Sequence, residues 1–307
     1  MRQPASPPKA PSAAVAKPWR RPLVLLMLLT AGCSPADPLN MLAWRGGWDV
    51  TSSIPYASGP RHALDVYAPR GAADAPVIVF LYGGNWQSGR KEMYRFVAAA
   101  LAARGYVTIV PDYRVYPDVF PAFLEDGARA VAWAKQNAAR FGGNPGKLVL
   151  MGHSAGAHIA AMLTLDGQWL RTAGLDSRKD IAGLIGIGGP YDFLPLRDPT
   201  LQAIFAADDM TRTQPISFVS GGEPPALLVT GQTDKTVSPG NTRRLAARLR
   251  AAGGDVTEIV YPRVGHLSII GAFAPVLRFL APLLRDIDVF VGRATTQSDA
   301  RHSVGSP

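Results

Sequence analysis

The sequence predicts an α/β domain in which helices cover both faces of a mostly parallel central sheet. The first observation is that short apolar runs, typical of buried strands, alternate along the chain with stretches whose pattern is typical of helices. Such alternation builds parallel sheets that are covered on both faces. The second observation is size. The chain has 307 residues, of which 47% are hydrophobic and 18% charged, and this suffices for one large core.

The elements can be placed in order from their apolar patterns. Strands are expected at residues 77–82, 107–110, 148–151, 181–187, 226–230 and 256–261. Helices are expected between and after them, at residues 92–104, 123–140, 155–165, 241–252 and 268–284. Residues 191–222 have a mixed composition without a clear period, which predicts either a small cap insertion or an ordinary long excursion. We expect the folded domain to span residues 49–288 and residues 289–307 to form a disordered tail.

Residues 1–32 predict an export signal. The chain carries basic residues and no acid up to residue 21, then seven apolar residues at 23–29, and then the small residues Ala31 and Gly32. This order is typical of a signal peptide, and the apolar run is too short to span a bilayer. The sole cysteine, Cys33, follows directly, and one cysteine cannot form a disulfide within the chain.

The junction at Cys33 resembles the lipobox of bacterial lipoproteins, in which the cysteine is acylated and becomes the first residue. The resemblance implies an exported chain that is lipid-anchored at Cys33 to a bacterial membrane, facing the periplasm or the outside, with residues 33–48 as a linker. Thr30 stands where the lipobox usually has Leu. Plain secretion with an incidental cysteine is the alternative.

A serine sits between a predicted strand and a predicted helix, in Gly152-His153-Ser154-Ala155-Gly156. A G-x-S-x-G motif in this context indicates a nucleophile elbow, because the elbow of α/β-hydrolases is a sharp strand-to-helix turn that exposes the serine Oγ. Side chains at the two glycine positions would collide with the neighbouring strand and helix. The pattern therefore predicts an α/β-hydrolase fold with Ser154 as the nucleophile.

A nucleophilic serine needs a histidine base and an orienting carboxylate, which come after it in this fold in the order acid, then histidine. His266 comes after a predicted strand and before a predicted helix, whereas His302 lies in the predicted disordered tail. His153 and His158 are too close to the serine in sequence, and we expect His62 on the surface. Asp234 lies in the glycine-containing loop after a predicted buried strand and is the expected acid. The competing carboxylates lie in less suitable segments: Asp192, Asp208 and Asp209.

Acyl transfer also needs N–H donors for the negative oxygen of the tetrahedral intermediate. The predicted strand at residues 77–82 ends in Gly83-Gly84-Asn85-Trp86, where this fold places its second donor. We expect the oxyanion hole to comprise the N–H groups of Gly84, Asn85 and Ala155. Large side chains that could line a substrate pocket, although such residues more often belong to the core, are Trp86, Tyr191, Phe193 and Phe205.

Four stretches of the chain resemble a branch of the esterase and lipase superfamily. They are Gly83-Gly84-Asn85-Trp86, Val110-Pro111-Asp112-Tyr113-Arg114, Phe141-Gly142-Gly143-Asn144-Pro145 and Gly152-His153-Ser154-Ala155-Gly156-Ala157-His158. The branch includes hormone-sensitive-lipase-like esterases, feruloyl and acetyl-xylan esterases, prenylcysteine methylesterase-like proteins and kynurenine formamidases. The resemblance implies a Ser154-His266-Asp234 triad and a structural role for residues 112–114. These families usually begin the glycine motif with histidine, where this chain has Tyr82.

Charge and composition argue against a nucleic-acid-binding protein and against a metal- or cofactor-dependent enzyme. The net charge is +9, but residues 1–32 carry five basic residues and no acid, so processing before Cys33 would leave +4. That scattered excess, without a basic and aromatic stripe, does not indicate a nucleic-acid partner. The sequence has no zinc-like ligand spacing and no phosphate-binding loop, so we expect no metal and no cofactor.

The sequence thus predicts a serine carboxylesterase, a hydrolase that splits small-molecule carboxylic esters through an acyl-enzyme. Two alternatives stay open. An arylformamidase or amidase would use the same triad on a C–N bond. A catalytically silent, lipid-anchored binding protein could also be built on this fold. Oligomeric state and acyl-chain preference have no signal in the sequence.

Overall fold

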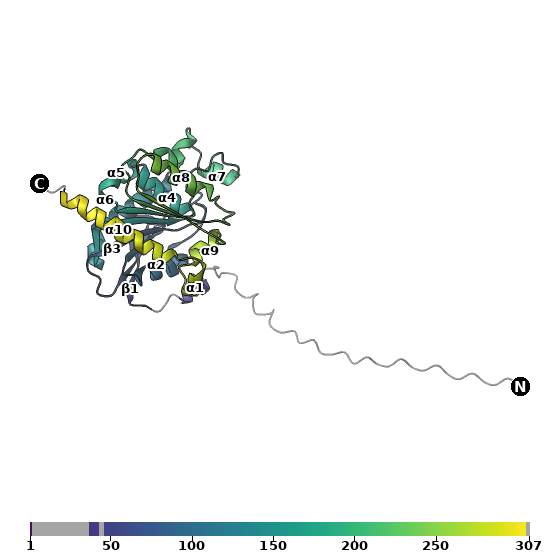
Figure 1. Cartoon of the computed structure of the whole chain (residues 1–307), viewed down its shortest axis with the longest axis horizontal. Helices are drawn as coiled ribbons and strands as arrows, with labels where there is room; N and C mark the ends of the chain where they lie inside the picture. Colours follow the sequence, from purple (N-terminus) through teal and green to yellow (C-terminus); the bar gives the residue numbers. More distant parts are fainter. Residues whose placement is uncertain (2–36, 43–45, 305–307) are drawn as a thin grey trace. The chain divides into compact units, whose positions relative to one another are not determined.

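The computed structural model of this chain describes residues 1, 37–42 and 46–304. Residues 35–307 form one compact unit, whose centre is an eight-stranded sheet (Figure 1). The predicted signal segment and Cys33 lie outside the described residues. Among those described, no helix combines the length and apolar character that a membrane span requires.

The sheet is mostly parallel, as predicted. Its strands are β1 (Trp48–Pro55), β2 (Ala63–Pro69), β3 (Ala75–Leu81), β4 (Val107–Pro111), β5 (Gly143–His153), β6 (Gly183–Ile187), β7 (Ala226–Gly231) and β8 (Val256–Tyr261). They lie in the order β1-β2-β4-β3-β5-β6-β7-β8, and all neighbours from β4 to β8 are parallel. The six predicted strands correspond to β3–β8.

Two antiparallel strands at one edge were not predicted. β1 pairs with β2, and β2 pairs with β4, both antiparallel. β1 is mostly exposed and carries polar residues, so no apolar run marks it. β2 contains the buried carboxylate Asp65, which interrupts the hydrophobic pattern. Both strands therefore depend on pairing along the sheet rather than on a local signal.

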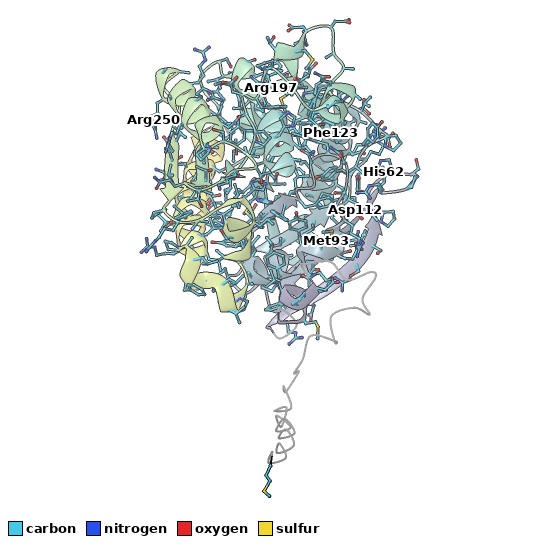
Figure 2. The ribbon with its side chains drawn as sticks, turned by 90° about the vertical axis from the view of Figure 1, so that its right-hand side faces the viewer. His62, Met93, Asp112, Phe123, Arg197 and Arg250 are labelled. Carbon is cyan, nitrogen blue, oxygen red and sulfur yellow. The ribbon has the colours of Figure 1, made fainter. Side chains whose placement is uncertain are left out.

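Helices cover both faces of the sheet. They are α1 (Asp37–Leu42), α2 (Arg95–Ala102), α3 (Ala122–Asn137), α4 (Ala155–Leu165), α5 (Gln168–Thr172), α6 (Ser177–Asp180), α7 (Pro199–Ile204), α8 (Gly240–Ala251), α9 (His266–Gly271) and α10 (Leu283–Val304), with short 3₁₀ turns η1 (Lys91–Tyr94), η2 (Ala138–Phe141), η3 (Met210–Thr213), η4 (Pro215–Phe218) and η5 (Pro275–Leu280). Figure 1 shows α2 and α10 on one face and α4 and α8 on the other. In Figure 2, Arg250 of α8 and His62 of the β1–β2 hairpin lie on opposite sides of the domain.

The central strands place two loops side by side. β3 pairs with β5 so that Leu81 lies opposite Gly152, and both strands end there or one residue later. The loop after β3 and the turn after β5 therefore meet at the carboxyl edge of the sheet. This is the edge at which open α/β sheets build their sites.

The carboxyl-terminal part differs from the prediction. The single helix expected at residues 268–284 is divided into α9, η5 and the start of α10, because Pro275 and Pro282 cannot continue a helix. The disordered tail expected at residues 289–307 is wrong for residues 289–304, which continue α10. Its buried face includes Phe290, Val291 and Ala294, and the helix packs on β5 and β6.

The predicted linker at residues 33–48 contains the helix α1, and this helix is attached to the domain. The Asn40 side chain donates to the Glu92 carbonyl oxygen at 3.0 Å and accepts from the Phe96 N–H at 3.0 Å. Residues 37–42 are therefore part of the folded unit rather than a free connection.

Candidate active site

The serine predicted as nucleophile lies in a strained turn between β5 and α4. Ser154 has φ 56° and ψ −125°, a backbone conformation that L-residues rarely adopt. A Cβ on Gly152 would lie 2.2 Å from the Gly156 oxygen, and a Cβ on Gly156 would lie 2.0 Å from the Leu81 oxygen. Both glycines are therefore required by the close approach of strand, turn and helix, as predicted from the sequence.

Three side chains from distant parts of the chain meet in hydrogen-bonding order. Ser154 Oγ lies 2.8 Å from His266 Nε2, and His266 Nδ1 lies 2.7 Å from Asp234 Oδ2. A carboxylate only accepts, so Nδ1 carries the proton and Nε2 can accept the serine hydroxyl proton. All three side chains are buried. The arrangement can raise the nucleophilicity of a hydroxyl without a metal ion.

Asp234 is held by the loop after β7. Its Oδ1 accepts hydrogen bonds from the N–H groups of Thr236 at 2.9 Å and Val237 at 2.8 Å, which leaves Oδ2 facing the imidazole. The competing carboxylates are elsewhere: Asp192 pairs with Arg244, Asp209 accepts from the Thr211 N–H at the start of η3, and Asp208 is exposed. None of the three bonds to His266.

The loop after β3 lies beside the serine. Gly84, Asn85 and Trp86 all have positive φ, of 143°, 57° and 57°. A Cβ on Gly83 would lie 2.9 Å from Ser154 Cβ, so only glycine allows the loop this close. Gly84, Asn85 and Ala155 line the same cavity as Ser154. The structure thus brings together the three residues predicted to supply oxyanion donors.

Tyr82, which replaces the histidine expected from the family pattern, braces this loop. Its hydroxyl donates to Asp112 Oδ1 at 2.8 Å and accepts from Arg61 Nη2 at 2.9 Å. Burial raises the pKa of the Tyr82 phenol well above its usual range, so the hydroxyl keeps its proton. Tyr113 stacks on the Tyr82 ring and donates its own hydroxyl to the Tyr82 carbonyl oxygen. Sequence reasoning missed Arg61, which has no motif of its own.

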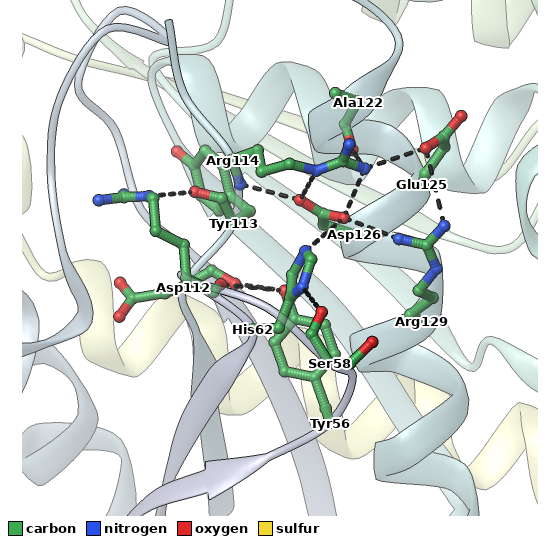
Figure 3. Close-up of polar contacts among 11 residues, drawn as sticks. Tyr56, Ser58, His62, Asp112, Tyr113, Arg114, Ala122, Glu125, Asp126 and Arg129 are labelled. Atoms are coloured by element: carbon green, nitrogen blue, oxygen red, sulfur yellow. Dashed lines mark hydrogen bonds and ion pairs between the residues drawn. The ribbon is translucent and has the colours of Figure 1, made fainter. Parts of the chain in front are cut away.

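Residues 112–114 are structural, as the resemblance implied. Figure 3 shows Arg114 hydrogen-bonded to the fully buried Asp126 of α3. The backbone N, Nε and Nη2 of Arg114 donate to the Asp126 carboxylate at 2.8–2.9 Å. Arg129 and His62 also contact Asp126, the latter at 3.0 Å. The surface position expected for His62 is therefore wrong, because a buried carboxylate needs several donors and recruits the imidazole as one of them.

The two histidines near the elbow are structural neighbours of the triad. His153 donates from Nε2 to the His266 carbonyl oxygen at 3.2 Å, and burial, together with repulsion from His266, lowers its pKa to about 3. His158 in α4 donates from Nε2 to the Thr213 carbonyl oxygen at 2.9 Å, and burial lowers its pKa to about 4. Both are therefore neutral at pH 7. His302 lies in the last turn of α10.

A cavity of about 820 Å³ opens at Ser154. Of the predicted pocket residues, Trp86 and Phe193 line it, whereas Tyr191 and Phe205 do not. The pocket role predicted for Tyr191 is wrong: its ring is fully buried against Gly186 and Gly189, and its N–H donates to Asn241 Oδ1. Phe205 lies behind Trp86, with ring centroids 4.7 Å apart.

The segment expected as a cap contributes one wall of the cavity. Residues of this wall include Phe193, Leu196 and Leu201, the last of which lies in α7. Tyr94 and Leu267 also line the cavity, and sequence reasoning missed them. Only Leu267 had a usable signal, since it is the residue directly after the predicted histidine. In the described part of the chain, no group of His, Cys, Asp and Glu side chains could hold a metal ion.

Comparison with known proteins gives a consistent picture. The BD-FAE family model matches residues 64–249, which is more than half of the chain. The chain is similar to Esterase LipC of Mycobacterium tuberculosis, with 29% identity over 238 residues that cover 71% of this chain and 57% of LipC. It is also similar to the isoprenylcysteine alpha-carbonyl methylesterase of Arabidopsis thaliana, with 27% identity over 248 residues, 72% of this chain and 57% of the relative. The chain thus spans a little over half the length of these relatives.

A solved structure has the same fold. It is a truncated form of a carbohydrate esterase from gut microbiota, and it superposes with a TM-score of 0.68 at 21% identity, over 82% of this chain and 98% of that one. The α/β-hydrolase fold predicted from the sequence is confirmed.

Proposed function

This chain belongs to the BD-FAE family, and on that basis we propose that it is a carboxylic ester hydrolase that uses Ser154, His266 and Asp234 as its catalytic triad. The observation that carries the proposal is the continuous hydrogen-bonded order from Ser154 Oγ through His266 to Asp234 Oδ2. The names of the two relatives, an esterase and a methylesterase, support the same reaction class.

In the proposed mechanism, Ser154 Oγ attacks the ester carbonyl carbon while His266 Nε2 takes the hydroxyl proton. The carbonyl π electrons move onto the oxygen and form a tetrahedral oxyanion. When this intermediate collapses, the C–O bond to the alcohol breaks and His266 returns the proton to the leaving oxygen. Water then attacks the acyl-enzyme with His266 as base, and the acid and free Ser154 are released.

Asp234 stabilises the imidazolium that forms in each step. Its two backbone donors fix the carboxylate, so Oδ2 stays directed at His266 Nδ1. The proposed oxyanion donors are the N–H groups of Gly84, Asn85 and Ala155. Donors of this kind are worth about 3 to 4 kcal/mol each in the transition state. Because the loop and the elbow are held in place before substrate binds, little reorganisation is needed.

The triad assignment is tested with Ser154→Ala. We expect this variant to lose hydrolysis of short p-nitrophenyl esters and labelling by a fluorophosphonate probe while melting at the same temperature as the parent. Substantial remaining turnover would exclude this nucleophile. Comparing esters with N-formyl aromatic amines in the parent protein separates an esterase from a formamidase on the same triad. A protein that turns over neither class and is not labelled would be a silent binding protein.

We propose in addition that the chain is exported and anchored to a bacterial membrane by a lipid on Cys33. The support is the order of basic, apolar and small residues before this cysteine. The test is expression in a bacterium with labelled fatty acid. We expect label on the parent and none on Cys33→Ser, which should move to the soluble fraction. Unlabelled parent protein in the soluble fraction would mean plain secretion.

A further inference from the structure

Exposed apolar side chains gather on α9 and η5, next to the catalytic histidine. Leu267 is 77% exposed, Val276 is 53% exposed and Phe279 is 81% exposed. η5 contains four apolar residues besides its proline, and none of its residues is buried. Leu277 packs on Gly271, which joins η5 to α9. We call Leu267, Val276 and Phe279 the apolar rim.

The apolar rim borders the mouth of the site. Leu267 is the residue after His266 and lines the cavity that opens at Ser154. The helix after η5 begins beside the carboxyl end of β8, where the Tyr261 hydroxyl donates to Asp286 at 2.7 Å. η5 is thus held at the carboxyl edge of the sheet, which is the edge that carries the site. Leu267 thus places one end of the rim at the entrance of the cavity.

Basic side chains without an ion partner lie on the loops that carry the triad and on η5. Lys235 and Arg263 are exposed on the loops that carry Asp234 and His266, and Arg278 is exposed on η5. In the described residues none of the three is engaged by an acidic side chain. Apolar groups surrounded by cations complement an anionic lipid surface, because the acyl region accepts the apolar groups and the headgroups attract the cations.

Helix α1 lies next to the site as well. α1 contacts η1, and Tyr94 of η1 lines the cavity. Figure 1 shows α1 and α9 on the same side of the domain. Asp37, the first residue of α1, is four residues after Cys33, a span of at most about 14 Å in an extended chain. A lipid on Cys33 would therefore hold this edge close to the bilayer.

We propose that the apolar rim inserts into an anionic lipid bilayer and that the site receives its ester substrates from the lipid phase. The second half rests on the proposed esterase function, whereas the first half does not. A bilayer fits better than a second copy of this chain, because equal positive charges around two rims would repel each other.

The experiment uses the compact unit, residues 35–307, so that the apolar run at 23–29 does not contribute to binding. Sedimentation measures its partition onto vesicles of phosphatidylcholine with phosphatidylglycerol, and onto phosphatidylcholine alone. The test variants are Phe279→Ser and Val276→Ser. The matched control is Val50→Ser, because Val50 is a 47% exposed apolar residue away from the rim. Val50 in β1 lies opposite Tyr67 in β2, and Tyr67 lies opposite Thr108, near the amino end of β4.

We expect Phe279→Ser to lower the partition coefficient on anionic vesicles by about tenfold and Val276→Ser to lower it less, with Val50→Ser unchanged. Hydrolysis of a long-chain p-nitrophenyl ester in vesicles should fall in parallel, whereas hydrolysis of p-nitrophenyl acetate in water should stay the same. Vesicle binding that does not depend on Phe279, or no binding to anionic vesicles, would overturn the proposal. If the parent forms a dimer and Phe279→Ser is monomeric, the proposal is also overturned, and the rim is instead a contact between two copies of the chain.

The experiment distinguishes failure of the membrane proposal from failure of the proposed esterase function. If the protein hydrolyses no ester but its vesicle binding still depends on Phe279, the membrane contact stands and the reaction assignment falls. Ser154→Ala provides the converse check, because it should bind vesicles like the parent although it hydrolyses nothing.

Discussion

Replacing Asp234 by asparagine should inactivate the site without disturbing its structure, and the local hydrogen bonds show why. Two backbone N–H groups, of Thr236 and Val237, point at Oδ1 and require an acceptor there. The asparagine oxygen must take that position, so its NH₂ group takes the position of Oδ2, facing His266. An NH₂ group can only donate, and Nδ1 must then become an acceptor.

This change reverses the tautomer of His266. With Nδ1 unprotonated, Nε2 carries the proton and donates to Ser154 Oγ instead of accepting from it. The imidazole can no longer take the serine proton, and no carboxylate stabilises the imidazolium. A substitution of this kind in a Ser-His-Asp triad lowers kcat by about 10⁴-fold. This corresponds to about 5 kcal/mol of lost transition-state stabilisation.

The assay is kcat for p-nitrophenyl butyrate together with the rate of fluorophosphonate labelling, both of which should fall. Asp192→Asn is the matched control, because this carboxylate pairs with Arg244 outside the triad and its loss should leave kcat within about twofold. Thermal melting of Asp234→Asn should stay close to that of the parent, since all backbone donors keep an acceptor. Retention of more than about a tenth of kcat would refute the reasoning about the tautomer.

Three further predictions concern stability. Gly156→Ala places a Cβ 2.0 Å from the Leu81 oxygen, so urea unfolding should show a loss of about 3 kcal/mol or no folded protein, and an unchanged midpoint would contradict the packing argument. Tyr82→Phe removes a donor from Asp112 and an acceptor from Arg61, which should lower the free energy of unfolding by about 1 to 3 kcal/mol; a loss below that range would mean water replaces the hydroxyl. His153 and His158 have folded pKa values of about 3 and about 4, below the usual 6.5. Between the folded pKa and pH 6.5, each histidine is therefore protonated in the unfolded chain but not in the folded one. Stability should therefore be full above pH about 6.5 and fall by up to about 1.4 kcal/mol per pH unit for each histidine as the pH drops. His158→Asn should remove about half of this slope in urea titrations, and a flat profile in the parent would disprove the linkage.

The triad could be predicted because each member has a strong local signal. Ser154 and Asp234 come after the buried strands β5 and β7, His266 comes after the half-buried edge strand β8, and the loops at the carboxyl ends of parallel strands lie at the same edge of the sheet. The walls of the cavity had no such signal. Leu196 and Leu201 come from a segment without a period, and their position depends on how that segment folds back over the sheet. Tyr191 was misassigned because an aromatic ring after a strand can turn inward where glycines leave space.

The fold shows the same division between local and long-range information. β3, β4, β6, β7 and the second half of β5 are buried and therefore appear as continuous apolar runs, whereas β8, at the other edge of the sheet, is only half-buried. β1 is an exposed edge strand, so its residues do not have to be apolar. α10 was missed beyond residue 284 because its sequence is polar overall, although Phe290, Val291 and Ala294 recur at the helical spacing that buries one face. A short buried stripe on a polar helix is easily hidden by its average composition.

The replacement of the family histidine by Tyr82 has a physical consequence for the site. Asp112 Oδ1 accepts from the Tyr82 hydroxyl, just before the glycine loop, and from the Lys91 N–H, just after it. One carboxylate oxygen thus joins both ends of the loop that carries Gly84 and Asn85. Arg61 adds a third attachment by donating to the Gly89 oxygen at 2.7 Å. In related families a histidine within the motif supports this loop. Here Asp112, at the end of β4, and Arg61, in the β1–β2 hairpin, support it instead, and the loop is fixed before substrate binds.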